Sequence, residues 1–355
     1  MGKRYIAYTR HSYYQTSPDY AVVNIHNKRN LRYTGHNQSV VRCCEVRMIL
    51  RYAQLSRHPV VFHAMTGLTV AAFDDLVSDL LPACVQAKQQ RLTRPNRRRV
   101  IGGGRHADLC WTNQVLLTIV WLRTYPTNEV LAYLMGVSDS TISRVLARMV
   151  PLLEAAGKDS MRMPDPGRKR RRQLDDLLRD TPELAVVIDT FEQRVQRCKD
   201  PDAADAHYSG KKKQHTLKSQ VAVDEETGQI VDVADSVLGP TADITVLEQS
   251  GLLSRLPEGV GGIGDLAYVG MDKLHPKGLG ASPRRKPRGK DRPPEDIAYN
   301  RAFSRRRIVV EHTIGRMRRY QALSQTDRHH RQHHSARVRA VAGLVNRQRP
   351  QYASC

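Results

Sequence analysis

The chain has 355 residues, which is enough for two domains of ordinary size with sizeable cores. Lys and Arg number 57 against 35 for Asp and Glu, giving a formal net charge of +22, while the charged fraction of 26% is ordinary. The excess is therefore one of sign, not of charge density. No apolar run approaches the roughly 18 residues of a membrane span or forms a signal peptide, so we expect a soluble, unsecreted protein with no membrane partner. The six cysteines include no C-x-x-C pair and are expected to be free thiols.

Residues 1–58 form a basic arm without apolar periodicity through most of its length. The arm contains ten Lys or Arg and two acids, and six tyrosines lie among the first 33 residues. Such a segment could lie on DNA through its charges and tyrosine rings. The composition nevertheless favours a poorly ordered extension, and we assign no site to it.

Changes in composition divide the rest of the chain into four segments. We predict a helical DNA-binding domain with a helix-turn-helix, a basic linker, a strand-rich domain and a short tail, over residues 59–158, 159–182, 183–348 and 349–355. The first helix of the helical domain is expected over residues 70–85. Its inward residues would be Ala72, Leu76, Leu80 and Ala83.

The helix-turn-helix is the clearest pattern in the N-terminal half. A helix over residues 113–123 is followed by a second that Thr127 caps and Gly136 ends, and a third begins at Ser138 or Asp139. In a helix-turn-helix, outward residues at the start of the third helix meet base edges or phosphates in a major groove. These residues are Ser140, Thr141, Ser143 and Arg144. The alternative is an ordinary helical hairpin that packs against the rest of the protein.

The strand-rich domain is predicted to be a mixed α/β fold. Strands are expected over residues 184–188, 217–224 and 229–238, the last two joined by a hairpin turn. A helix over residues 241–253 and a long helix over residues 296–320 follow. Strands followed by alternating helix and strand are typical of a mixed α/β domain.

An acidic segment interrupts this basic chain and holds two of three unusual carboxylates. Residues 181–270 carry eight bases and fifteen acids, whereas the next fifty residues carry fifteen bases and five acids. Asp189 ends an apolar strand, Asp265 ends a short strand after a glycine-rich run, and Glu311 follows three apolar residues on the long helix. One such Asp alone is more simply a cap or turn residue. Together, the three predict a site for two Mg²⁺ or Mn²⁺ ions, which can stabilise the attacking and leaving oxygens of a phosphoryl transfer.

Four ordered sequence blocks resemble one known family. The blocks are VIDTFEQRV, YSGKKKQHTLKSQVAVDEETGQI, GDLAYVG and YNRAFSRRRIVVEHTIGRMRRY. They resemble the DDE transposases of bacterial insertion sequences, in the branch related to the eukaryotic Harbinger elements. The resemblance spans residues 64–346 and includes the helix-turn-helix. It implies an RNase H-like catalytic domain in which Asp189, Asp265 and Glu311 are the catalytic, metal-binding carboxylates. Asp243 also matches an acidic position of the family, but it is as well placed to cap a helix, so we leave it out of the site.

The resemblance also implies contacts with DNA around the third carboxylate. Arg307 matches the family's Arg four residues before Glu311. Ser304 stands where the family has Tyr, and Arg318 keeps only the charge of the family's Lys, so the resemblance implies no role here that needs the Tyr hydroxyl or the Lys ammonium. A basic segment before the second strand also matches the family. We interpret it as a phosphate clamp in preference to a solvated turn, and it comprises Lys211, Lys212 and Lys213.

The predicted function is that of a metal-dependent DNA transposase in the bacterial cytoplasm, associated with the nucleoid. It would nick DNA at the inverted repeats of its element and join the freed 3′-hydroxyl to target DNA, acting as a homo-oligomer of at least two chains. Strand transfer comes from the resemblance; the residues themselves argue only for phosphodiester cleavage. The alternatives are a catalytically silent or domesticated DNA-binding protein and an RNase H-like nuclease without strand transfer.

A histidine-rich stretch over residues 326–334 is a second candidate for DNA contact. Its four histidines are His329, His330, His333 and His334. We reject a zinc site, because structural zinc takes four ligands and the neighbouring Arg side chains repel a dication. Contact with DNA phosphates that strengthens as the imidazoles protonate is the expected role.

Overall fold

The computed structural model describes residues 49–93, 107–168 and 173–348. Most of the predicted basic arm and the whole predicted tail lie outside these ranges. The chain divides into two compact units, residues 1–45 and 46–355, and every feature described below belongs to the second unit. In the described ranges no single helix is long and apolar enough to cross a membrane; one pair of helices meets that criterion only when joined across a bend of 56°.

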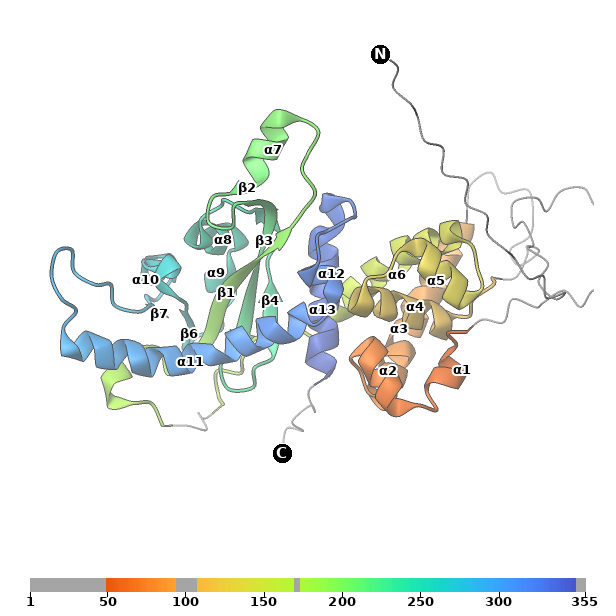
Figure 1. Ribbon diagram of the computed structural model, residues 1–355. Coiled ribbons are helices and arrows are strands. Elements are labelled where there is room, and N and C mark those ends of the chain that lie inside the picture. The colour runs from red at the N-terminus through yellow and green to blue at the C-terminus, as the bar shows by residue number, and fades with distance from the viewer. Residues whose placement is uncertain (1–48, 94–106, 169–172, 349–355) are drawn as a thin grey trace, which may run out of the picture. The chain divides into compact units, whose positions relative to one another are not determined.

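The described chain begins with helices (Figure 1). They are α1 (Tyr52–Leu55), α2 (Pro59–Thr66), α3 (Val70–Leu92), α4 (Trp111–Thr124), α5 (Asn128–Met135) and α6 (Asp139–Asp159). Helix α3 continues beyond the predicted end. Its inner face contains Phe73 and Cys84, one residue beyond the predicted Ala72 and Ala83, because the larger side chains gain more from burial.

The predicted helix-turn-helix is confirmed in α4, α5 and α6. Helix α5 ends at Gly136, whose φ of 63° is the left-handed conformation that glycine adopts at little cost. Ser138 then caps α6, since its hydroxyl accepts a hydrogen bond from the backbone N–H of Thr141. The inward face of α6 is buried over its first three turns through Ile142, Val145, Leu146 and Met149.

A mixed sheet forms the second half of the described chain. Its strands are β1 (Leu184–Arg194), β2 (Tyr208–Ser209), β3 (Gln214–Asp224), β4 (Ile230–Val233), β5 (Val237–Leu238), β6 (Val260–Ile263) and β7 (Gly280–Ala281). The order is β2-β3-β1-β6-β7, and β4 and β5 also pair with β3. β1 is antiparallel to β3 and parallel to β6, so the expected mixed α/β architecture after a helical region is confirmed.

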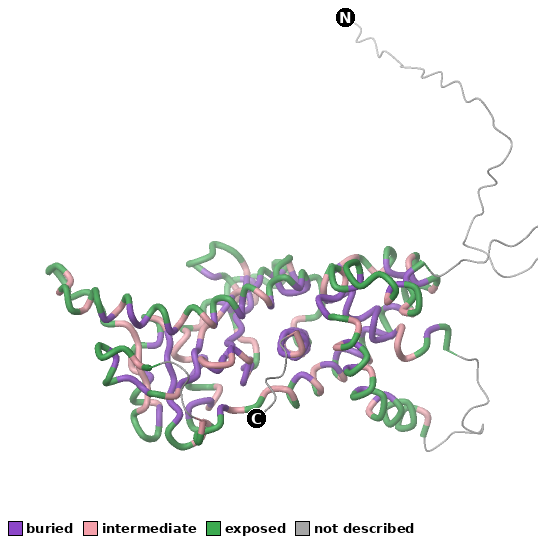
Figure 2. Tube along the Cα trace, turned by 90° about the horizontal axis from the view of Figure 1, so that it is seen from below, coloured by how far each residue is buried: buried purple, intermediate pink, exposed green. Residues whose placement is uncertain are grey.

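Helices cover both faces of this sheet. The helices of this half are α7 (Pro201–His207), α8 (Asp243–Ser250), α9 (Leu252–Arg255), α10 (Met271–Leu274), α11 (Pro294–Arg318), α12 (Gln321–Ser324) and α13 (His334–Arg347), with short 3₁₀ turns at Asp176–Leu178, Leu266–Tyr268 and Arg331–His333. The helix predicted over residues 241–253 is broken into α8 and α9 at Gly251, whose φ is 60°. Buried residues run through the strands and the inner faces of the helices (Figure 2).

Alternation along β1 separates two cores. Val187 and Phe191 belong to a large cluster that includes residues of α11, α13 and the N-terminal helices. Val186 and Ile188 belong to a smaller cluster with α8 and α9. Because side chains alternate along a strand, the odd-numbered residues of β1, including Asp189, face α11.

Helix α13 closes the edge of the sheet at β4. The Asn346 side chain accepts a hydrogen bond from the N–H of Ile230 (2.8 Å) and donates one to its carbonyl (2.9 Å). The Arg339 Nε donates to the Val233 carbonyl (3.1 Å). These contacts satisfy backbone groups that would otherwise be free to pair with another strand.

Candidate active site

Asp189 and Asp265 lie near each other just beyond the parallel pairing of β1 with β6. Val187 of β1 is opposite Ile263 of β6, and each Asp lies two residues beyond its member of that pair. The prediction that Asp189 ends its strand is wrong. β1 continues to Arg194, because β3 goes on pairing with it after β6 has ended. The end of the parallel pairing, not the end of β1, places the two carboxylates together.

The surroundings of Asp189 penalise its negative charge. Its pKa is raised to about 6, chiefly by burial and also by the negative charges of Asp265 and Asp243. The backbone N–H of Thr190 and the guanidinium of Arg307 act in the opposite direction. A half-buried carboxylate with two acidic neighbours is therefore a place where a bound cation gains stabilising charge interactions.

Glu311 comes to this region from α11, the helix that covers the Asp189 face of the sheet. The helix is held there by a buried apolar stripe, which consists of Phe303, Val310, Ile314 and Met317. The Glu311 carboxylate is 57% exposed and lies 3.9 Å from the guanidinium of Arg307, one turn earlier. Arg307 also acts on Asp189, so it is within electrostatic range of both carboxylates.

A buried ion pair that we did not predict lies behind Asp189. Asp243 accepts hydrogen bonds from the Lys218 ammonium (2.6 Å) and the Thr190 hydroxyl (3.0 Å). The Lys218 side chain is only 9% exposed, and the Asp243 side chain is 12% exposed. Asp243 does not cap α8, since Ala242 holds the cap position and Asp243 is the first helical residue. Instead it fixes α8 against β1 and β3 beside the acidic pair.

The carboxylate oxygens suit a hard divalent cation, although the described residues do not form a complete metal site. In the described part of the chain no three His, Cys, Asp or Glu side chains lie close enough to hold a metal ion. Asp189 and Asp265 offer carboxylate oxygens, the ligands that Mg²⁺ and Mn²⁺ prefer. A third carboxylate, Glu311, lies on α11 in contact with Arg307.

The four residues predicted to contact DNA lie at the start of α6. Ser140, Ser143 and Arg144 are exposed, while Thr141 is half-buried. The Arg144 guanidinium donates to the carbonyl (2.9 Å) and to the hydroxyl (3.0 Å) of Ser140. Three of the four are thus accessible to a ligand, and Arg144 is held along the helix surface.

The predicted phosphate clamp lies away from the carboxylates. Lys211, Lys212 and Lys213 are exposed in the turn between β2 and β3. Asp189 is opposite Val221, and Lys213 is eight residues earlier, or roughly 26 Å along an extended strand. Arg318 is also exposed, about 10 Å beyond Glu311 along the α11 axis. Ser304 is exposed on the same helix.

The expectation that the four histidines contact phosphates is wrong for His334. Its side chain is fully buried, with Nδ1 2.7 Å from the Ser236 hydroxyl and Nε2 2.9 Å from the Gln193 side-chain oxygen. Burial lowers the pKa of His334 to about 4. The ring of His329 packs against Trp121, 4.8 Å between centroids, and burial lowers its pKa as well. Only His330 and His333 keep exposed side chains free of such packing.

Because the pKa of His334 is lowered by burial, we expect the stability of the folded protein to depend on pH. The unfolded chain takes up a proton near pH 6.5, whereas folded His334 resists protonation down to about pH 4, so stability is lost as the pH falls through this window. The loss is about 3 kcal/mol at most. Urea denaturation at about pH 7.5 and about pH 4.5 should show it for the parent and for the exposed control His333→Gln, and a smaller loss for His334→Gln. Equal losses in all three proteins would contradict this account.

Two family models match the chain. Residues 107–159 match the helix-turn-helix of DDE superfamily endonuclease, and residues 188–346 match the DDE superfamily endonuclease itself. A probable transposase for insertion sequence element IS702 from Microchaete diplosiphon is 29% identical over 285 residues, which are 80% of this chain and 93% of that protein. No solved structure matches.

The chain belongs to the DDE superfamily endonucleases and carries their helix-turn-helix domain. The two matched segments together make up more than half of the chain, in the order that the sequence analysis predicted. The helical region followed by a mixed sheet with helices agrees with an RNase H-like catalytic domain. Membership also implies nuclease chemistry with a divalent metal.

Proposed function

We propose that the protein is the DNA transposase of an insertion sequence, which cleaves DNA at the ends of its element and joins them to target DNA. The observation that carries the proposal is the juxtaposition of Asp189 and Asp265 beside β1 and β6, with Glu311 on the helix that covers the same face. The transposase relative covers most of both chains and supports the same assignment.

Asp189, Asp265 and Glu311 would hold the divalent metal, which we propose to be two Mg²⁺ or Mn²⁺ ions. When bound, the metal supplies a stronger nucleophile and stabilises charge on the phosphate oxygens. Arg307 lies 3.9 Å from Glu311 in the free protein. When Glu311 turns toward Asp189, the Arg307 guanidinium becomes free to bind the scissile phosphate, which suits its planar array of donors.

The remaining residues position the reacting groups. The Lys218 and Asp243 pair fixes the Thr190 hydroxyl, and so keeps the backbone beside Asp189 in place. Arg318 contacts the DNA backbone further along α11 through its charged planar guanidinium, in place of the compact ammonium of a Lys. Lys211, Lys212 and Lys213 bind phosphates distant from the cleavage point.

Recognition of the element is assigned to the helix-turn-helix. Ser140, Thr141, Ser143 and Arg144 on α6 would read the terminal inverted repeats in a major groove. The protein would act as a homo-oligomer of at least two chains, because two ends must be cut and joined together. We place it in the cytoplasm, on the nucleoid, with no membrane partner. We propose for the helical domain, the linker, the catalytic domain and the tail the boundaries that the sequence predicts.

A plasmid that carries the coding region with its flanking DNA tests the function. With Mg²⁺ present, the purified protein should release 3′-hydroxyl ends at the element boundary and join them to a second plasmid. Cleavage without joined products would instead identify a nuclease that lacks strand transfer. Specific binding without any cleavage would identify a catalytically silent DNA-binding protein.

Replacing Ser140 and Arg144 by Ala should reduce the preference for terminal-repeat DNA over random DNA. Each lost base contact lowers discrimination by about 1–3 kcal/mol, so the ratio of affinities should fall at least about fivefold. A competition binding assay measures this ratio, with Lys88→Gln on exposed α3 as the control. An unchanged ratio would leave this segment with a packing role only.

A further inference from the structure

A basic pocket of about 1080 Å³ lies where β1 ends and β3 begins, at the end of this antiparallel pair that is away from Asp189. It is bounded by the end of β1, by β2, by the start of β3 and by the loop after α12. The side chains that give it its character are Arg194, Arg197, Tyr208, Lys213, His215 and Arg328. None of the predicted catalytic residues contributes to it.

Among the residues that the structure describes, no acidic side chain neutralises the positive charge of this basic pocket. No Asp or Glu lines it. In the described part of the chain, Arg194, Arg197 and Lys213 form no ion pair. Arg328 lies with its guanidinium 4.2 Å from the centre of the Tyr125 ring, which orients it without removing its charge. An unneutralised cluster of cations in a concavity attracts an anionic ligand.

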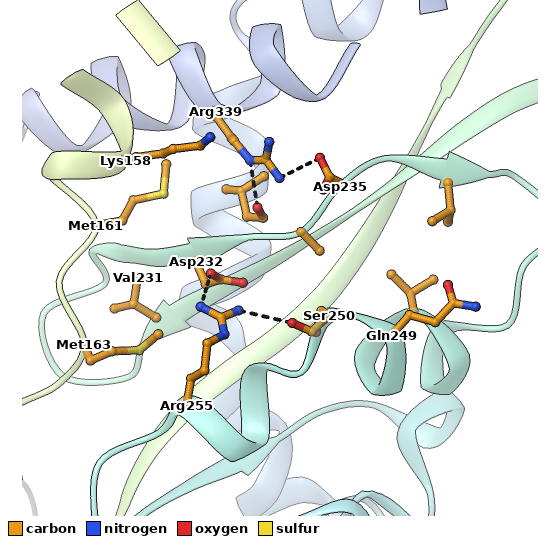
Figure 3. Close-up of a pocket in the computed structure, with 14 residues that line it drawn as sticks. Lys158, Met161, Met163, Val231, Asp232, Asp235, Gln249, Ser250, Arg255 and Arg339 are labelled. Carbon is orange, nitrogen blue, oxygen red and sulfur yellow. Dashed lines mark hydrogen bonds and ion pairs between the residues drawn. The ribbon is translucent and has the colours of Figure 1, made fainter. Parts of the chain in front are cut away.

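A second cavity differs from the basic pocket, because its arginines are paired with carboxylates. The cavity of about 530 Å³ between α6, β4, α8 and α13 also contains arginines (Figure 3). There Arg255 lies 3.0 Å from Asp232, and Arg339 lies 2.7 Å from Asp235. Because its cations are paired with carboxylates, this cavity offers little to an anion.

The basic pocket also offers an aromatic ring. Tyr208 is 45% exposed, which is unusual for a large aromatic side chain. The ring of His215 holds it in an edge-to-face arrangement, with 5.6 Å between centroids and an angle of 66° between planes. Proteins bind unpaired nucleotides with an exposed aromatic ring beside basic side chains. The base stacks on the ring, and the basic side chains bind the phosphate.

The basic pocket lies at a distance from Asp189 that one DNA strand bound at the carboxylates could span. His215 is six residues from Val221, the partner of Asp189, so both lie on the α11 face of the sheet. Arg194 is five residues beyond Asp189, or about 17 Å along the strand, and by the same alternation its side chain leaves β1 on the opposite face. About five nucleotide steps of a DNA strand, at 3.4 Å each, span that distance.

We propose that the basic pocket binds an unpaired nucleotide of a DNA strand, with the base stacked on Tyr208 and the phosphate held by Arg194, Arg197 and Lys213. The role of this nucleotide in cleavage rests on the proposed function. An unpaired ligand is favoured because a base in a duplex has both faces covered by its neighbours, whereas the ring of Tyr208 is open to stacking.

Binding of a fluorescent oligothymidylate to the full chain without metal tests the stacking contact. Tyr208→Ala should weaken binding about 5- to 100-fold, the usual effect of losing one stacked base. Tyr208→Phe, which keeps the ring, should bind within about twofold of the parent. A duplex of equal length should be little affected by either change. Equal losses for duplex and oligothymidylate would show a backbone site for duplex DNA and overturn the proposal.

The salt dependence of the same binding tests the phosphate contact. Arg194→Gln and Arg197→Gln should each lower the slope of log affinity against log salt by about 0.7, the value for one phosphate on a single strand. Tyr208→Ala should leave that slope unchanged, and so should the control Lys88→Gln on α3. Unchanged slopes in both arginine variants, or unchanged affinity in Tyr208→Ala, would overturn the proposal.

These results are independent of catalysis. An inactive protein that still shows the Tyr208 and arginine effects would refute the proposed function and leave the basic pocket standing. An active transposase without these effects would refute the basic pocket alone.

Discussion

Asp189→Asn and Asp265→Asn should each reduce DNA cleavage by about 10³-fold or more. Each change removes a carboxylate charge from the only place where two of the predicted ligands already lie together, and a metal-stabilised transition state loses several kcal/mol without it. Binding of DNA should stay within a few-fold of the parent, because phosphate contacts supply most of the affinity. Cleavage of a labelled duplex and gel-shift titration measure the two effects.

Glu311→Gln should lose cleavage to the same extent, although Glu311 is mostly exposed and paired only with Arg307. Asp272→Asn is the matched control, since Asp272 is an exposed carboxylate on α10 of the same domain. Retention of cleavage in Glu311→Gln together with its loss in Asp189→Asn would restrict the metal site to the two Asp residues.

Arg337→Met should destabilise the fold by about 3–5 kcal/mol, the usual result of leaving one member of a buried ion pair without its partner. Arg337 and Asp327 form such a pair, with side chains 3% and 1% exposed. The Tyr125 hydroxyl also donates to Asp327 (3.2 Å), and the Asp327 N–H donates to the Arg194 carbonyl (2.8 Å). The pair therefore joins α13, α4 and the end of β1.

An exposed pair provides the control for this measurement. Arg179 and Asp176 lie 3.0 Å apart with side chains 76% and 82% exposed, so Arg179→Met should change stability by less than about 1 kcal/mol. Urea denaturation near neutral pH compares the two variants. A loss below about 1 kcal/mol in Arg337→Met would show that the buried charge of Asp327 is compensated from elsewhere.

Local patterns predicted the elements well where their signals lie close together in the sequence. Helices α4 to α6 follow from apolar spacing, Gly136 and Ser138, which are all short-range signals. The order of Asp189, Asp265 and Glu311 also follows from the sequence. Their juxtaposition depends on the parallel pairing of β1 with β6, which the sequence does not state, since 65 residues separate the two strands.

Contacts between distant residues account for the errors. A Lys in strand β3 and an Asp at the start of α8 give no joint signal, so the pair of Lys218 and Asp243 was missed. One feature of the sequence could have indicated a buried partner: Lys218 is a charged residue within an otherwise uncharged run of β3. His334 appeared similar to its three neighbours, and only the packing of α13 against Gln193 buries it.

The most direct test of the central claim is a crystal structure of the protein with Mn²⁺ and DNA of an element end, in which anomalous scattering locates the metal. We expect Mn²⁺ bound by the carboxylates of Asp189 and Asp265, with Glu311 turned away from Arg307 to become the third ligand, at metal–oxygen distances of about 2.0–2.2 Å. Carboxyl groups more than about 10 Å apart in the DNA complex, or metal bound elsewhere, would contradict the assignment of these three residues.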